Sequence, residues 1–187
     1  MQGLQVRDQV LSPYEISQQV RLAIGCVSRC SWDKGLDIRH LRGYMVRDQH
    51  KPNRTPEDPE WYECVIATDQ SLAWQHIVWT KEILQIFDNG AARTNSEAAL
   101  REMLETRNTQ NANVSNALPS TQADRNGFVL ALASAVPYRY RVVLRQNGYL
   151  DRFPLDELEK LLVVPQEKIV FLLDGSFEEH FEAALQE

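Results

Sequence analysis

The stretch from about Ser71 to Phe87 most constrains how this chain can fold, because it predicts a helix that is apolar on nearly every side. A run rich in aromatic and β-branched residues, 61–67, comes shortly before it and is typical of a strand. Thr68 and Asp69 can cap the helix. Its apolar residues spread widely around the axis: Leu72, Ile77, Trp79, Ile83, Leu84 and Phe87. We therefore expect this helix at the centre of the fold.

The same helix carries the sequence Lys81-Glu82-x-x-Gln85, which has the spacing of the H-E-x-x-H sequence of zinc peptidases. H-E-x-x-H places two zinc-binding imidazoles one helical turn apart, beside a glutamate that acts as general base. A protonated lysine has no lone pair to donate, and a carboxamide oxygen is a poor zinc ligand. We predict that Lys81 and Gln85 bind no zinc, so that only Glu82 keeps the residue type that such catalysis needs.

A first helix is predicted to begin at Ser12-Pro13-Tyr14-Glu15. These residues supply an N-cap hydroxyl, a proline at the first helical position and a capping-box glutamate. Apolar residues recur at helical spacing from Ile16 to Val27, so the helix should place an apolar stripe on a core.

The remaining chain predicts mostly helices. We expect short strands over 44–46 and 61–67, and helices over 122–136, 138–146, 155–162 and 165–173, with a last helix that Ser176 caps. The segment 106–120 is polar and rich in asparagine, and we expect a flexible loop there. The length of 187 residues fits one domain. The predicted fold is α+β and mostly helical, with a small sheet packed on the central helix.

This order of elements resembles the ImmA/IrrE-like family of bacterial and phage proteins. A strand leads into the motif helix at Lys81 to Asp88, and a later helix begins near Gln122 and ends at a hydrophobic-proline step, Val136-Pro137. A second such step, at 164–165, separates the two short helices of a small helical segment over 155–174. The resemblance covers residues 12–174, and a C-terminal helix is expected over 175–187.

Active members of this family use a zincin-type H-E-x-x-H helix and a third zinc ligand from a glutamate on a later helix. The resemblance therefore implies that the first two ligand positions are Lys81 and Gln85. The third falls near Ser120, with Gln122 and Asp124 as the nearest alternatives. We expect a degenerate member of the family that binds neither zinc nor another cofactor. The Lys81 ammonium, one turn from Gln85, could partly replace the charge of the metal.

Two functions remain open for this chain. In the first, Glu82 pairs with Lys81 or another cation, and the protein is an inactive zincin-like regulator that acts by protein–protein interaction in a bacterium or phage. Lys81, Gln85, Asp88 and Asp124 then form the former site, with Asp88 one turn beyond Gln85. In the second, Glu82 is the general base of an active hydrolase or peptidase whose rearranged site also uses Asp88, Asp124 and a distant histidine.

Composition bears on the class of partner. The net charge of -6 and the pI near 5.3 argue against bulk attraction to nucleic acid or anionic lipid. The helices over 155–174 could form a helix-turn-helix, but the second offers no Arg or Asn to read base edges. We find neither a signal peptide nor an apolar stretch of membrane-spanning length. We expect a cytoplasmic protein with a protein partner; nothing in the sequence indicates its oligomeric state.

The cysteines form an odd set without paired C-x-x-C spacing: Cys26, Cys30 and Cys64. We interpret them as reduced, partly buried thiols. Two weaker alternatives remain: a metal site that uses Cys26, Cys30 and a distant histidine, and a Cys64–His76 nucleophile.

Overall fold

The computed structural model describes residues 11–47, 59–87 and 119–186, and side chains in the last range from residue 124 onward. Asp88, His50 and most of the predicted loop over 106–120 lie outside the described residues. The expectations about them therefore stay predictions. Two hydrophobic cores organise the described chain, and a single helix contributes to both.

The sheet has three strands: β1 (Val27–Asp33), β2 (Gly43–Arg47) and β3 (Trp61–Ala67). Their order is β1-β3-β2, with β3 parallel to β1 and antiparallel to β2. Along β3, Tyr62, Cys64 and Ile66 are buried while the residues between them are partly exposed. This alternation means that one face of the sheet lies on a core.

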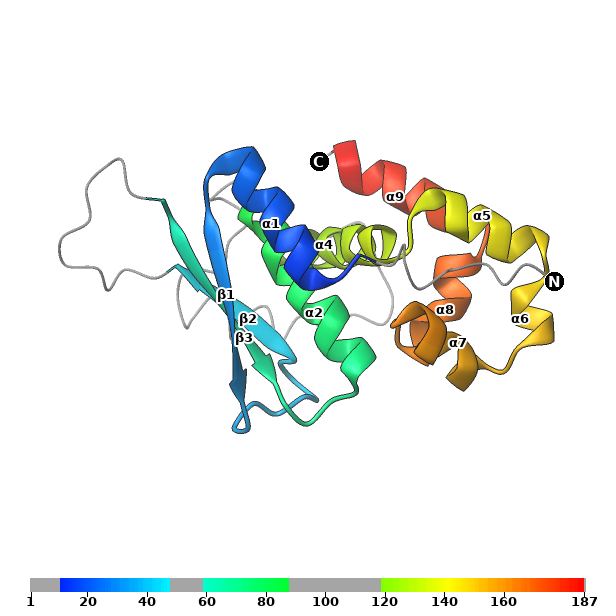
Figure 1. The fold of residues 1–187 in the computed structure, drawn as a ribbon, viewed down its shortest axis with the longest axis horizontal. Helices are drawn as coiled ribbons and strands as arrows, with labels where there is room; N and C mark the ends of the chain where they lie inside the picture. The colour runs from blue at the N-terminus through cyan, green and yellow to red at the C-terminus, as the bar shows by residue number, and fades with distance from the viewer. Residues whose placement is uncertain (1–10, 48–58, 88–118, 187) are drawn as a thin grey trace.

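Two helices cover that face, α1 (Pro13–Ile24) and α2 (Leu72–Leu84), and α2 continues as a 3₁₀ turn over Gln85–Phe87 (Figure 1). The predicted capping box of α1 is present: Ser12 Oγ accepts from the Glu15 amide, and Glu15 accepts from the Ser12 amide at 2.7 Å. The helix ends at Ile24, because Gly25 adopts a left-handed conformation with φ of 72°. The expected extension to Val27 is therefore wrong, and Val27 begins β1.

Gly43 sets how closely α2 approaches the sheet. A Cβ atom at this position would lie 2.6 Å from Val78 Cγ1 and 2.9 Å from the Val65 carbonyl oxygen. Only glycine therefore fits at the start of β2 without a shift of the helix or the neighbouring strand. The first core lies beneath this contact, between the sheet, α1 and α2.

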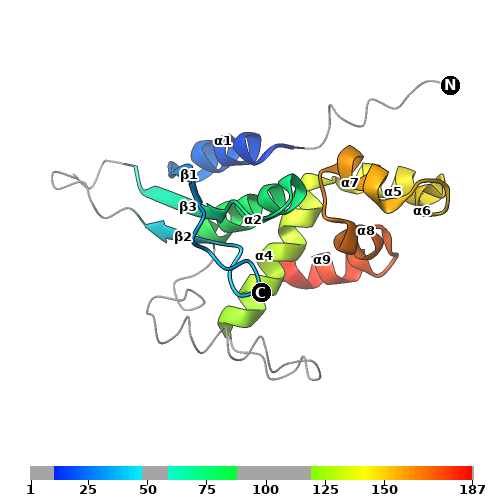
Figure 2. The ribbon, with the colours of Figure 1, turned by 90° about the horizontal axis from the view of Figure 1, so that it is seen from below.

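The second core is helical. A long helix, α4 (Pro119–Ala135), crosses α2 and leads to α5 (Tyr138–Gln146), α6 (Tyr149–Arg152), α7 (Leu155–Leu162), α8 (Gln166–Leu173) and α9 (Phe177–Gln186). Both views show α5 to α8 at the end of the molecule away from the sheet, with α4 between (Figures 1 and 2). Helix α4 begins three residues before the predicted start at Gln122. The predicted fold class, a mostly helical α+β domain with a small sheet, is confirmed.

The central position of α2 is confirmed as well. Val78 and Ile83 belong to the first core, whereas Ile77 belongs to the second. Side chains in the interior of α2 are buried on opposite sides of its axis, including those of His76, Thr80 and Glu82. The apolar residues spread around this helix in the sequence indicate this placement, since a peripheral helix would need only one apolar stripe.

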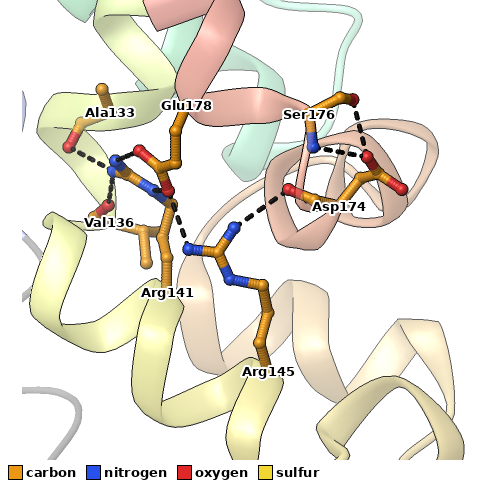
Figure 3. A network of polar contacts seen from close by, with 7 residues as sticks. All are labelled: Ala133, Val136, Arg141, Arg145, Asp174, Ser176 and Glu178. Atoms are coloured by element: carbon orange, nitrogen blue, oxygen red, sulfur yellow. Dashed lines mark hydrogen bonds and ion pairs between the residues drawn. The ribbon is translucent and has the colours of Figure 1, made fainter.

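Arg141, on α5, is buried inside the helical end of the molecule and is 1% exposed (Figure 3). Its guanidinium donates to the Val136 carbonyl at 2.6 Å, at the C-terminal end of α4. It also donates two hydrogen bonds to the Glu178 carboxylate, at 3.1 and 2.7 Å. Arg145 donates to the same carboxylate at 2.8 Å. One buried cation thus joins α4, α5 and α9.

No single helix of the described residues is long and apolar enough to cross a membrane. The segments Asp124–Ala135 and Tyr138–Gln146 reach the required length and composition only as a pair, and a bend of 72° separates them.

We predict that Arg141→Ala lowers the free energy of unfolding by about 3 kcal/mol, because the buried Val136 carbonyl loses its Arg141 donor and the Glu178 carboxylate keeps only Arg145. Arg139→Ala, an exposed position on the same helix, should change this free energy by less than about 0.5 kcal/mol. Urea denaturation followed by circular dichroism measures both values. Equal losses in the two variants would contradict the assigned role of Arg141.

Candidate functional site

Lys81 lies between two carboxylates where α2 meets α4. Its Nζ atom forms an ion pair with Asp124 Oδ1, and it lies 2.8 Å from Glu82 Oε1. The side chains of Lys81 and Glu82 are 12% and 4% exposed, and that of Asp124 is 23% exposed. The structure therefore brings together Lys81, Glu82 and Asp124, three of the residues that the sequence predicts at this site.

Gly127 allows the two helices to approach closely at this site. A Cβ atom on Gly127 would lie 3.3 Å from Lys81 Cγ and 3.4 Å from Gln85 Cγ. The side chains of Lys81 and Gln85 therefore both point toward α4, one turn apart on the same side of α2. Asp124, one turn before Gly127, meets Lys81 on this side. Ser120 and Gln122 belong to the first turns of α4, and their side chains lie outside the described residues.

The electrostatics of the site follow from its burial. Burial raises the pKa of Glu82, and the opposing attraction of Lys81 does not fully cancel this effect. Burial alone would lower the pKa of Lys81, but Glu82 and Asp124 outweigh it, so the pKa of Lys81 is raised. Lys81 is thus charged at neutral pH, and the buried carboxyl group of Glu82 lies beside it. Among the described residues, Glu82 Oε1 has this ion pair but no aligned hydrogen bond.

The described histidines make their contacts elsewhere. His76 Nε2 lies 3.0 Å from the Leu11 carbonyl oxygen, and burial lowers the pKa of His76. His40 lies beside Asp37 on the surface, and the His180 ring packs near Phe171. Of the rearranged hydrolase set, the structure brings together Glu82 and Asp124, while Asp88 lies outside the described residues. Among the residues that the structure describes, no group of three or more His, Cys, Asp or Glu side chains is arranged to hold a metal.

The three cysteines are free thiols. Burial raises the pKa of Cys30 to about 11, and burial also raises the pKa of Cys64. A thiol of this kind stays protonated at neutral pH, so Cys64 is not an activated nucleophile. Cys26 and Cys30 do not share a helix face, because Gly25 ends α1 and Cys30 belongs to β1.

The segment that could form a helix-turn-helix packs against the N-terminal end of α2. The Trp74 indole N–H donates to Glu167 at 2.9 Å, and Ser71 Oγ donates to Glu159 at 3.2 Å. The Arg42 guanidinium lies 3.9 Å from the centre of the Trp74 ring on the sheet side. Two acidic residues of α7 and α8 thus serve intramolecular contacts. Whether the chain binds nucleic acid stays a prediction.

Comparison with known proteins gives no relative: no family model matches the chain, and no curated protein or solved structure is significantly similar to it. The likeness to ImmA/IrrE-like proteins therefore remains an expectation from the residues and the order of the elements.

We predict that Lys81→Met lowers the free energy of unfolding by about 3 kcal/mol at neutral pH, because two neighbouring carboxylates lose their cation in a buried site. Lys160→Met removes an exposed lysine whose partner is Asp156 at 3.2 Å, and it should change stability by less than about 0.5 kcal/mol. Chemical denaturation measures the free energy of unfolding of both variants. A loss at Lys81 no larger than that at Lys160 would mean that the buried ion pairs do not form.

A second prediction concerns pH. Because the pKa of Glu82 is raised above its ordinary value of 4.5, its contribution to stability is fully present below pH 4.5 and is lost as the pH rises through the folded-state pKa. Glu82→Gln removes this dependence, so the variant should gain stability relative to the wild type as the pH rises from about 4 to about 8.

Glu15→Gln is the matched control for this pH series. Hydrogen bonds from Ser12 lower the pKa of Glu15, so its contribution is present above pH 4.5 and is lost as the pH falls. This variant should therefore lose stability relative to the wild type as the pH rises. Melting temperatures across the pH series measure both trends, and the same direction in both variants would refute the assignment for Glu82.

Proposed function

We propose that this chain is a catalytically inactive, zincin-like protein that acts by binding another protein, in a regulatory role in a bacterium or phage. One observation carries the proposal. The ammonium of Lys81 lies between Glu82 and Asp124, in the sequence frame where an active zinc peptidase has its first ligand and its general base.

The chemistry of peptide hydrolysis supports inactivity. A metal peptidase needs a cation that polarises the substrate carbonyl and activates a water molecule, together with a base that can reach that water. Lys81 is engaged by two carboxylates, and Glu82 is 3% exposed. Glu82 is the motif residue that matches active members of the family. It is thus buried and paired with Lys81, which stands at the first ligand position.

Exposed apolar side chains support a binding role. Leu150, Phe153 and Leu155 are each more than a third exposed and lie within six residues of one another at α6 and the start of α7. The Phe153 ring stacks on Tyr149 with 4.9 Å between the ring centres. Exposed apolar and aromatic side chains are the kind that protein contact sites bury at their centre.

Restoring the zinc frame tests the structural part of the proposal. The double variant Lys81→His/Gln85→His should bind one zinc ion per chain, with Asp124 as a third ligand on the facing helix, whereas the wild type should bind none. Because any two histidines one turn apart attract zinc, the control is Asp156→His/Lys160→His on the exposed side of α7. We expect at least about ten-fold tighter zinc binding at 81/85, and loss of that advantage on Asp124→Asn.

Calorimetric zinc titration of the untagged proteins measures these affinities. Equal affinities of the two histidine pairs would contradict the zincin-like frame. Stoichiometric zinc in the wild type, with peptidase activity that a chelator abolishes, would instead establish the active hydrolase.

The partner is tested by affinity purification from the organism that encodes the chain, with wild type and Glu82→Gln as matched baits. An inactive binding protein should retain the same partners in equal amounts with both baits and release no cleaved product. If Glu82 were a catalytic base, the Gln variant would enrich an uncleaved substrate that the wild type processes. That outcome would overturn the proposal.

A further inference from the structure

Three sulfur-containing side chains lie in one row across the sheet. Cys30 of β1 is the register partner of Cys64 of β3, and Met45 of β2 is the register partner of the same Cys64. Because β3 is the central strand, the two thiols and the thioether occupy neighbouring strands at one level.

All three side chains point to the same face of the sheet. The preceding pair in the register, Arg29 and Glu63, forms an ion pair at 3.0 Å with the Arg29 side chain about half exposed, which places the alternate residues on the other face. Cys64 is fully buried in the first core, and Cys30 and Met45 pack against that core. The row thus lies beneath α1 and α2.

The residue types in this row are those that favour a soft cation. Thiolate and thioether sulfurs select Cu(I), whereas a structural zinc site needs four nitrogen, sulfur or oxygen ligands. We propose that Cys30, Cys64 and Met45 form a binding site for Cu(I), with the two cysteines as thiolate ligands and Met45 as a weaker thioether ligand. Burial keeps both thiols protonated in the metal-free protein, so Cu(I) displaces the two protons to solvent as the two copper–thiolate bonds form, and the oxidation state of copper does not change.

The position of the row gives the ion a path of entry. Strand β1 is at the edge of the sheet, and Cys30 is partly exposed there, whereas Cys64 is fully enclosed. An ion that first binds Cys30 can therefore reach Cys64 on the next strand. Cys26 is also buried, but it lies four residues before Cys30, about 13 Å away along an extended strand. It is therefore outside the row and provides a matched control.

Anaerobic titration of the reduced 187-residue chain tests the site, with bicinchoninate as the competing Cu(I) chelator and far-UV circular dichroism as a check that the fold is kept. The wild type should take one Cu(I) per chain from the chelator. Cys30→Ser should weaken binding at least ten-fold, Met45→Leu should weaken it by less, and Cys26→Ser should bind like the wild type. Cys30 is chosen over Cys64 because a partly exposed position tolerates serine.

Three results would overturn the proposal: a wild type that leaves all Cu(I) with the chelator, a Cys26→Ser variant that loses as much affinity as Cys30→Ser, or binding only with loss of the folded signal. The wild-type titration decides the question even if a variant does not fold. Burial and Glu82, the ion-pair partner of Lys81, both raise the pKa of Cys64, but the Cu(I) titration and the zinc titration vary different residues, so each proposal can fail without the other.

Discussion

The contact between α2 and α4 is the constraint on which the rest of the structure depends, and the buried ion pairs of Lys81 lie within it. One side of α2 covers the sheet and the other packs on α4, so this helix belongs to both hydrophobic cores. Gly43 brings α2 close to the strands, and Gly127 brings α4 close to α2. A change at this helix pair should therefore affect the packing of the sheet and of the helical end together.

Local chemistry allowed much of the fold to be predicted from the sequence. The capping box at Ser12 fixes where α1 begins, and the apolar residues around Ile77 and Ile83 indicate a helix buried on several sides. The left-handed Gly25 explains the main error in this region. The spacing of apolar residues alone predicts that the first helix extends to Val27, although Gly25 is a signal for the end of a helix. For this reason strand β1 was not predicted from the sequence.

The site is formed by contacts between residues that are far apart in the sequence, and the spacing of apolar residues does not predict such contacts. Lys81 and Asp124 are 43 positions apart, and nothing in either local pattern specifies that they pair. The family resemblance placed Asp124 with Lys81 at one site, and Gly127 inside an otherwise ordinary helix was a further signal, since such a glycine often marks a close approach of two elements. The buried Arg141 was missed for a similar reason. Its partners, the end of α4 and Glu178, come together only when the helices pack.

The proposed inactivity depends on the ammonium of Lys81, which would occupy the place that the metal has in an active zinc peptidase. Glu82 and Asp124 bind that ammonium and are therefore not free to ligate zinc. The most direct test is a crystal structure of the wild type grown with excess zinc, with anomalous data collected at the zinc edge. We predict no anomalous peak between α2 and α4, and Lys81 Nζ within ion-pair distance of Asp124. A zinc peak bound by Glu82 and Asp124, with Lys81 displaced, would contradict the proposed inactivity.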